Sequence, residues 1–323
     1  MRAAVIGAGA MGSLAAFLLH SAGVEVVLYE SREERRSLLR ERGIVLRGAI
    51  EGGFAPEVGE AGKAEAPFDL MVLAVDAGQT GGALRPLSPF VHRDTAYLSL
   101  QDGFAAAELA SLVGAERTLV ALAWISAEEL PSGEVEVEGI RALKLGCLAE
   151  EEGGWLEELS AALGRTCPCG VEAVPDVDAG TWSRLQGAAA VSGVCAVAGM
   201  APLEARADGR LDVLCREAAE ECRRSAAAVG VELPVQESPW DEAVWGALRP
   251  PMLKRVEAGE ATEVAWMSGR IVEKARSTGL PVPVHGAIFT LVREIEGGRH
   301  RPGEAAAREL ERRAEEDRGM SLQ

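Results

Sequence analysis

The chain has few aromatic side chains, which make up 4% of its 323 residues, and only four histidines. Its six cysteines show no repeated Cys-x-x-Cys spacing, and only Cys167 and Cys169 lie close together in the sequence. A zinc site needs a larger set of closely spaced Cys and His ligands, so we expect no metal. Because free cysteine is most often a small core residue, we expect reduced and mostly buried thiols.

Positive charge is also scarce, since 33 Lys and Arg residues face 50 Asp and Glu residues and give a net charge of −17. Such a charge repels polyphosphate backbones, so we expect no nucleic-acid partner. No uninterrupted apolar run is long enough to cross a bilayer, so we expect no membrane partner. The first predicted strand begins within the first three residues and leaves no room for a signal peptide. These features together predict a soluble, cytoplasmic protein.

Apolar residues nevertheless make up 48% of the chain, as in globular proteins, and its length allows two domains. Over the first 175 residues, short apolar runs alternate with helical patterns, which is the rhythm of a parallel, doubly wound sheet. The stretch 134–148 alternates apolar and other residues and predicts added antiparallel strands. Strands are predicted at 3–7, 25–29, 69–75, 95–100 and 118–126.

From Asp176 onward the strand signal disappears and the pattern becomes helical. Residues 303–319 are charged nearly all round and predict a solvated, frayed helix. The expected fold class is α/β, with a Rossmann-type domain over 1–175 and an all-helical domain over 176–323. Helices of the second domain are predicted at 178–200, 211–229, 238–247, 263–277 and 284–296.

The segment VIGAGAMG at residues 5–12 carries the Gly-x-Gly-x-x-Gly spacing between an apolar strand and a helical pattern. In that context the first glycine permits the turn, the second admits a pyrophosphate, and the third allows close packing of helix and strand. The helix N-terminus then favours the anion. We expect dinucleotide binding here, with a turn that no longer binds as the alternative. The predicted cofactor contacts are Gly7, Ala8, Gly9, Ala10, Met11 and Gly12.

The second predicted strand ends at Glu30, eighteen residues beyond Gly12, where an acid can accept a hydrogen bond from the ribose 2′-hydroxyl. This favours NAD(H). Arg32 could instead meet a 2′-phosphate, which keeps NADP(H) as the alternative. A purely structural role for residues 31–33 at the start of a surface helix is the other interpretation.

The two halves together resemble the ketopantoate reductase family, and the resemblance covers nearly the whole chain. It implies a Rossmann domain, a helical domain, a substrate between them, and reduction of a 2-oxo acid by a nicotinamide hydride. The motifs that carry it are GAGAMGS at 7–13, LAVDAGQT at 73–80, LSLQDGF at 98–104, TWSRLQGAAAVSGVCA at 181–196, and the long stretch from PPMLK to GLPVPV at 250–284.

The resemblance also assigns individual residues. It implies that Glu263 matches the active-site glutamate of the family and that Gln79 matches a glutamine that contacts the cofactor. Ala74 and Asp102, within two of the motifs, would also lie beside the cofactor. Without the resemblance, Glu263 would be interpreted as an ordinary acid at a helix N-terminus, stabilised by the helix dipole.

Several positions depart from the family pattern. Arg184 replaces the lysine that serves as general acid, and an arginine side chain does not release its proton near neutral pH. Ala188 and Ser192 follow on the same helix face, where the family has asparagines that bind substrate. A further asparagine of the family falls near Pro202, and a serine of the family falls at Pro251. Nearly all side chains expected to hold ketopantoate are therefore absent.

Two departures concern the cofactor. Asp76 stands where the family has a lysine, and Asp102 where it has an asparagine. Each change places a carboxylate near the expected phosphates or nicotinamide, which weakens the case for NADPH. NAD(H) is therefore the favoured cofactor.

Three functions are open from the sequence. The first is a divergent reductase of a small carbonyl or imine substrate, in which Arg184 clamps a carboxylate or polarises the carbonyl, and Glu263 or a water it orients supplies the proton. The second is 2-dehydropantoate 2-reductase activity itself, and the third is a non-catalytic, cofactor-binding sensor or scaffold. A homodimer formed through the helical domain is a further hypothesis.

Overall fold

The structure is a computed structural model, and it describes all residues except 61, 150–153, 237, 241–244, 246–248 and 322–323. The chain folds as two compact units. The first contains residues 1–101 and 105–177, and the second contains residues 102–104 and 178–323. The short segment 102–104, which follows a strand of the first unit, therefore packs with the helices of the second.

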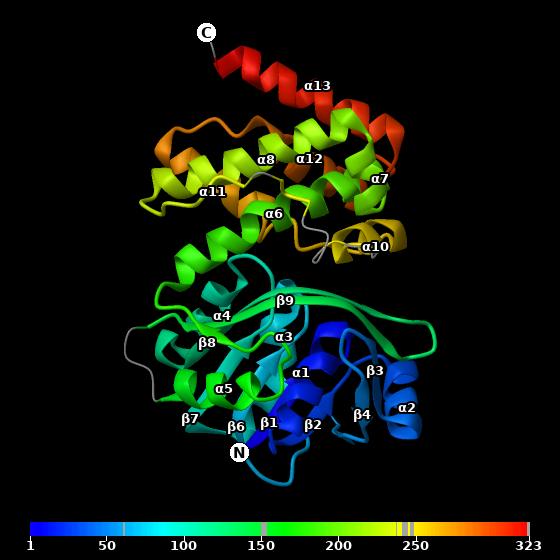
Figure 1. Cartoon of the computed structure of the whole chain (residues 1–323), viewed down its shortest axis with the longest axis vertical. Coiled ribbons are helices and arrows are strands. Elements are labelled where there is room, and N and C mark those ends of the chain that lie inside the picture. The colour runs from blue at the N-terminus through cyan, green and yellow to red at the C-terminus, as the bar shows by residue number, and fades with distance from the viewer. Residues whose placement is uncertain (61, 150–153, 237, 241–244, 246–248, 322–323) are drawn as a thin grey trace. The chain divides into compact units, whose positions relative to one another are not determined.

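The first unit is a mixed sheet with helices on both faces (Figure 1). Its strands are β1 (Arg2–Ile6), β2 (Glu25–Tyr29), β3 (Ile44–Gly48), β4 (Gly52–Phe54), β5 (Glu57–Val58), β6 (Phe68–Leu73), β7 (Val91–Ser99), β8 (Thr118–Glu129), β9 (Val135–Cys147) and β10 (Glu172–Ala173). Its helices are α1 (Ala10–Ser21), α2 (Glu33–Arg42), α3 (Thr80–Leu84), α4 (Ala105–Val113) and α5 (Trp155–Gly164), with the 3₁₀ turns η1 (Ala77–Gln79), η2 (Arg85–Phe90) and η3 (Ala115–Arg117).

The order of the parallel strands identifies the architecture. Strands β5, β2, β1, β6, β7 and β8 follow one another and pair in parallel, which is the order of dinucleotide-binding sheets. The order reverses between β1 and β6, and ligands of such sheets bind beyond the carboxyl ends of the strands at that point. Strand β9 pairs antiparallel with β8, as the alternation over 134–148 predicts, although it is one long strand.

Strand β1 shows why the central strands read as continuous apolar runs. Ala3 and Val5 pack into the cluster that includes α1 and α5, whereas Ala4 and Ile6 pack into the cluster that includes α3 and α4. Because both faces of the sheet are covered, no alternation with polar residues remains. The five predicted strands are confirmed, but β3, β4, β5 and β10 are not predicted. Strands β4, β5 and β10 have only three, two and two residues, and β3 lies beside β4 near one edge of the sheet.

The described part of the second unit is helical, with no strand (Figure 1). Its helices are α6 (Val177–Ala198), α7 (Pro202–Ala207), α8 (Gly209–Ala228), α10 (Pro251–Ala258), α11 (Ser268–Thr278), α12 (Pro283–Glu296) and α13 (Glu304–Ser321). The predicted helix over 263–277 begins only at Ser268, and residues 264–267 form a turn. Most of the predicted helix over 238–247 lies outside the described residues.

Helix α13 corrects the prediction of a solvated, frayed helix. Ala306, Ala307, Leu310 and Ala314 are buried in the helical core, and α13 packs along α12. These mostly small residues form a narrow apolar stripe that the surrounding charges hide in the sequence. The helix is therefore part of the fold.

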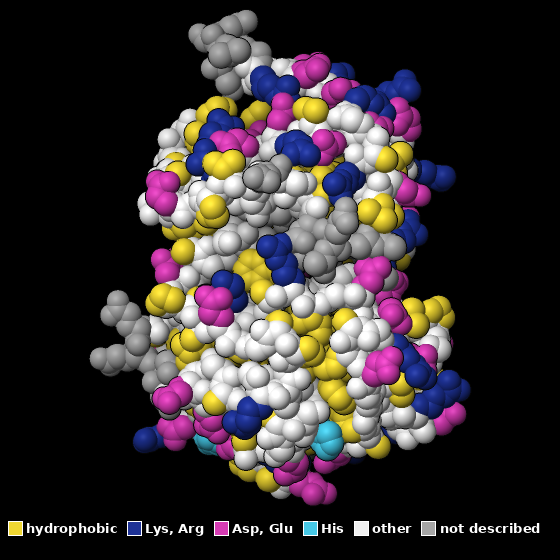
Figure 2. All heavy atoms as spheres, viewed as in Figure 1, with side chains coloured by type: hydrophobic (Ala, Val, Ile, Leu, Met, Phe, Trp, Pro, Cys, Tyr) yellow, Lys and Arg dark blue, Asp and Glu magenta, His cyan; other side chains and the backbone are white. Residues whose placement is uncertain are grey.

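The surface of the described residues is charged with both signs. On the face shown in Figure 2, Lys and Arg side chains lie among Asp and Glu side chains. Within the described residues, every helix is too short or too polar to cross a bilayer.

The six cysteines are free, and four of them are buried, whereas Cys147 is partly exposed and Cys169 is exposed.

A buried acid joins two helices of the second unit. The Glu221 carboxylate on α8 is 2% exposed and accepts the backbone N–H groups of Val284 at 2.8 Å and His285 at 2.9 Å, in the first turn of α12. These N–H groups have no partner within their own helix, so the contact is an N-terminal cap from a distant residue. Burial raises the pKa of Glu221 to about 7, against the lowering effect of the two N–H groups.

We expect Glu221→Gln to destabilise the protein by roughly 1–3 kcal/mol, because one of the two acceptor oxygens is replaced by an amide donor. Because the pKa of Glu221 is about 7 in the folded protein and 4.5 in the unfolded chain, protonation of Glu221 stabilises the folded wild type at low pH. This stabilisation is lost as the pH rises from about 4.5 through about 7. The glutamine does not titrate, so the difference in stability between wild type and variant shrinks over the same pH range. Urea unfolding at several pH values measures it, and a penalty that grows with pH would contradict the raised pKa.

Candidate functional site

The glycine turn between β1 and α1 is shaped by close approach of backbone atoms. Gly7 has a φ of +97°, which favours glycine, and a Cβ there would lie 2.6 Å from the carbonyl oxygen of Ala74, just after β6. A Cβ at Gly12 would lie 1.9 Å from the carbonyl oxygen of Gly7. Both glycines are therefore required by the packing of α1 against β1 and β6.

Gly9 differs from both of these glycines. A Cβ built there meets no atom within 4 Å, so the fold itself leaves open space at this position. Helix α1 begins immediately afterwards, at Ala10, and its first turn contains no acidic side chain. The open side of the turn and the start of the helix are the features that a bound anion requires.

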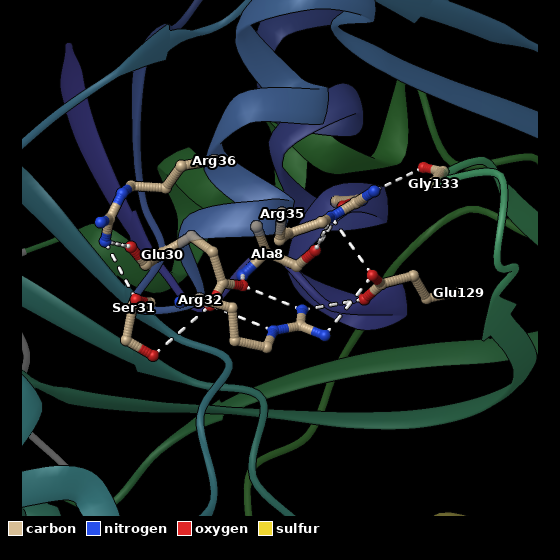
Figure 3. A network of polar contacts seen from close by, with 9 residues as sticks. Ala8, Glu30, Ser31, Arg32, Arg35, Arg36, Glu129 and Gly133 are labelled. Atoms are coloured by element: carbon tan, nitrogen blue, oxygen red, sulfur yellow. Dashed lines mark hydrogen bonds and ion pairs between the residues drawn. The ribbon is translucent and has the colours of Figure 1, made fainter.

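Glu30 directly follows β2, its side chain is only 5% exposed, and its carboxylate accepts several hydrogen bonds (Figure 3). It accepts the N–H of Ala8 at 3.1 Å and the backbone N–H of Arg32 at 2.9 Å. The Arg32 guanidinium adds bonds of 3.2 Å from Nε and 3.0 Å from Nη2. Burial raises the pKa of Glu30, but the bonds from Arg32 and Ala8 outweigh it and leave the pKa below its usual value.

The two residues expected to distinguish the cofactors are thus paired with each other. Arg32 also forms the N-cap of α2, without capping it by its side chain. The Arg32 side chain is 55% exposed, whereas that of Glu30 is nearly covered. The Ala8 N–H, expected at the cofactor, is taken by Glu30.

The same network contains two residues that the sequence does not single out. Arg35 on α2 is 3% exposed and donates to the Ala8 carbonyl at 3.0 Å, to Ser13 Oγ at 3.2 Å and to the Gly133 carbonyl at 2.5 Å. Glu129, the last residue of β8, pairs with Arg32 at 2.9 Å and with Arg35 at 3.5 Å. Glu129 and Arg32 are 97 residues apart, so no local pattern connects them.

The segment after β6 is held by a buried amide. Gln101 donates from Nε2 to the Val75 carbonyl and to Thr80 Oγ1, both at 2.9 Å. These bonds fix both ends of the segment that contains η1, where Gln79 lies with an exposed side chain. Gln101 stands within the motif at 98–104, but sequence reasoning assigns it no role.

In the second unit, two of the departures from the family pattern meet. Arg184 Nη2 on α6 lies 3.4 Å from Asp102 Oδ1, in the segment 102–104. The Arg184 side chain is 12% exposed and the Asp102 side chain 40%. The arginine and the aspartate, each unexpected alone, thus form one ion pair.

The segment 102–104 also contacts the turn that follows Glu263. The Phe104 N–H donates to the Trp266 carbonyl at 3.3 Å, and the Phe104 ring packs edge-on against Trp182 at 5.1 Å. Gly103 has a φ of +70°, and a Cβ there would lie 2.2 Å from the Trp266 carbonyl oxygen. The segment 102–104 therefore contacts both the helix that carries Arg184 and the turn that follows Glu263.

Glu263 precedes α11 by five residues, so its interpretation as an acid of the helix N-terminus is wrong. Next to it, the N–H and hydroxyl of Thr262 both donate to Glu296 Oε1 at 2.7 Å, and the Val264 N–H donates to the Thr262 hydroxyl at 3.2 Å. The Glu263 carbonyl accepts the Trp266 N–H at 3.0 Å. The backbone around Glu263 is thus fixed by hydrogen bonds without being helical.

The remaining positions on the substrate side are more enclosed. Ala188 is 2% exposed and lies in the helical core, and Ser192 is 4% exposed. Pro202 and Pro251 each occupy the first position of a helix, α7 and α10. Proline fits that position because its missing N–H would have no partner within the helix.

The strand order and the glycine turn define the class of Rossmann-type proteins with a separate helical unit. Family models assign the chain within that class. Residues 3–150 match the model described as "Ketopantoate reductase PanE/ApbA", and residues 176–296 match its C-terminal counterpart. The chain belongs to the ketopantoate reductase family, as its motifs indicate, and is an NAD(P)-dependent oxidoreductase.

A curated relative and two solved structures show how far the likeness extends. The 2-dehydropantoate 2-reductase of Mycobacterium tuberculosis is 29% identical over 307 residues, covering 91% of this chain and 98% of that protein. A D-mandelate dehydrogenase in ternary complex with NADH and anilino(oxo)acetate has a TM-score of 0.82 at 21% identity, covering 93% and 99% of the two chains. The 2-dehydropantoate 2-reductase of Geobacter metallireducens GS-15 has a TM-score of 0.81 at 23% identity, covering 91% and 99%. At these identities the two structures establish the shared fold alone.

The glycine turn gives a direct test of the packing. We expect Gly12→Ala to destabilise the protein by roughly 2–4 kcal/mol, because its Cβ would overlap the Gly7 carbonyl oxygen. Gly9→Ala should cost less than about 1 kcal/mol, because its Cβ enters open space and only the helix cap changes. Urea unfolding followed by circular dichroism measures both, and equal penalties would refute this difference between the two glycines.

Proposed function

We propose that the protein is an NADH-dependent reductase of a small 2-oxo acid or a related carbonyl or imine. The observation that carries the proposal is the glycine turn at the reversal point of the sheet, where Gly7 and Gly12 are forced by packing but Gly9 is not. A glycine that the fold does not need, at the start of a helix, fits a backbone that a pyrophosphate approaches closely. We therefore assign the residues around Gly9 to the cofactor.

The preference for NADH rests on the surroundings of Arg32. A 2′-phosphate needs cationic donors, but the guanidinium of Arg32 is already bonded to the carboxylates of Glu30 and Glu129. A ribose 2′-hydroxyl makes no such demand on charge. When bound, the nicotinamide supplies a hydride to the substrate carbon.

The residues that we assign to the substrate lie in the second unit. Arg184 is a fixed cation that can bind a carboxylate or polarise a carbonyl oxygen, and Asp102 at 3.4 Å orients its guanidinium. Since arginine does not release its proton near neutral pH, it is not the acid. We assign proton delivery to the carboxyl group of Glu263 or to a water that it orients.

A second candidate is the reduction of 2-dehydropantoate itself. It is favoured by the Mycobacterium tuberculosis relative, whose name states that activity. Against it stand Ala188 and Pro251, which replace polar groups that would bind that substrate. A site that loses the hydrogen-bonding partners of a substrate hydroxyl loses rate steeply, so we expect a smaller or more apolar 2-oxo acid to be the better substrate.

Cofactor binding tests the first step. We expect nicotinamide fluorescence titrations to give a dissociation constant for NADH about tenfold or more below that for NADPH. Gly9→Ala should weaken NADH binding, because its methyl group enters the space assigned to the pyrophosphate. Gly286→Ala, which adds the same methyl group to open space in α12, is the matched control. Binding of neither cofactor would refute the proposal, and tighter binding of NADPH would refute the preference.

The role of Glu263 is tested by turnover. With 2-oxo acids from pyruvate-sized to aromatic, and with 2-dehydropantoate, we expect Glu263→Gln to lower kcat by roughly 100-fold or more. Its dissociation constant for NADH should stay unchanged, since the amide has the same shape. Glu260→Gln, at a side chain that is 61% exposed, is the control. An unchanged kcat would remove Glu263 from the proton path.

A further inference from the structure

Glu129 reaches the cofactor side of the first unit from a distant part of the chain. It ends β8, and Figure 3 shows its carboxylate facing the guanidinium of Arg32. The contacts run from Nη2 to Oε2 at 2.9 Å and from Nη1 to Oε1 at 3.5 Å, so two nitrogens meet two oxygens. This is the forked geometry in which arginine binds a carboxylate most selectively.

The donors of Arg32 are almost all used. Two N–H groups, from Nε and Nη2, point to Glu30, and two more, from Nη2 and Nη1, point to Glu129. Arginine has five such donors, so one remains. The side chain is thus 55% exposed yet held between two carboxylates, and a phosphate that accepts two of its N–H groups would have to displace at least one of them.

The charges around this pair balance. Arg36 bonds to the backbone carbonyls of Glu30 and Ser31 and pairs with Glu33. Together these side chains form a cluster of three arginines and three glutamates: Arg32, Arg35, Arg36, Glu30, Glu33 and Glu129. Removing the charge of Glu129 would leave the cluster with a net charge of about +1, which favours a dianionic phosphate.

We propose that Glu129 is a positioning residue that sets the preference for NADH over NADPH by holding Arg32 in its pairing with Glu30. The inference rests on the proposed binding of a nicotinamide dinucleotide at the glycine turn. The two cofactors differ only at the 2′-position of the adenosine ribose. By pairing with Arg32, Glu129 makes the N–H donors of Arg32 unavailable to a group at that position and neutralises the positive charge of Arg32.

The test compares Glu129→Gln with Glu134→Gln. Glu134 follows β8 and pairs with Arg47 at 3.0 Å on the surface, so its variant removes one negative charge without touching Arg32. Dissociation constants for NADH and NADPH are measured for both variants and the wild type at one ionic strength. We expect Glu129→Gln to shift their ratio toward NADPH by about tenfold or more, and Glu134→Gln by less than about twofold.

Two further variants separate positioning from a merely structural role. In an Arg32→Gln background, Glu129→Gln should no longer shift the ratio, because the donor that it releases is absent. Glu129→Asp keeps the negative charge but places it one methylene farther from Arg32. It should shift the ratio of the two dissociation constants toward NADPH by less than Glu129→Gln does. It also provides the test should Glu129→Gln fail to fold, which thermal unfolding reports.

The outcomes separate the two proposals. If the wild type binds NADH but Glu129→Gln and Glu134→Gln change the ratio equally, Glu129 has no positioning role and the proposed function stands. A shift that persists in the Arg32→Gln background also overturns the inference, because Glu129 would then act by its own charge. If the wild type binds neither cofactor, the proposed function fails and the inference fails with it.

Discussion

The contact between α1 and the carboxyl ends of β1 and β6 is the constraint on which the rest of the first unit depends. There is no room for a side chain at Gly7 or Gly12, so the helix begins directly above the reversal point of the sheet. That position directs the backbone of Ala8 toward Glu30 and Arg35, and through them orders the end of β2 and the start of α2. Candidate cofactor residues far apart in sequence are thereby linked to one backbone turn.

Features that depend on neighbouring residues could be predicted from the sequence. The strand, turn and helix around Gly7, Gly9 and Gly12 follow from local spacing, and the apolar runs identify the central strands. The five-residue error at the start of α11 shows the limit of such local patterns. Thr262 and Glu263 look like the start of a helix, but bonds from Thr262 to Glu296 hold the chain in a turn.

Features that depend on distant residues could not be predicted. Arg184 and Asp102 each looked like the loss of a family residue, and only the fold shows that the two charges compensate each other. The same holds for Glu129, which stands at the end of a strand with no pattern that marks it. Sequence reasoning treated Glu30 and Arg32 as alternatives, whereas the structure makes them partners.

The segment 102–104 has a consequence for how such a protein can be taken apart. Because these residues pack with the helical unit while the chain on either side belongs to the sheet, the backbone passes between the two units three times. A helical fragment cut at one point would lack the partners of Trp182 and of the Trp266 carbonyl. Recombination that exchanges the helical unit between relatives must therefore also transfer residues 102–104, which lie within the sequence of the first unit.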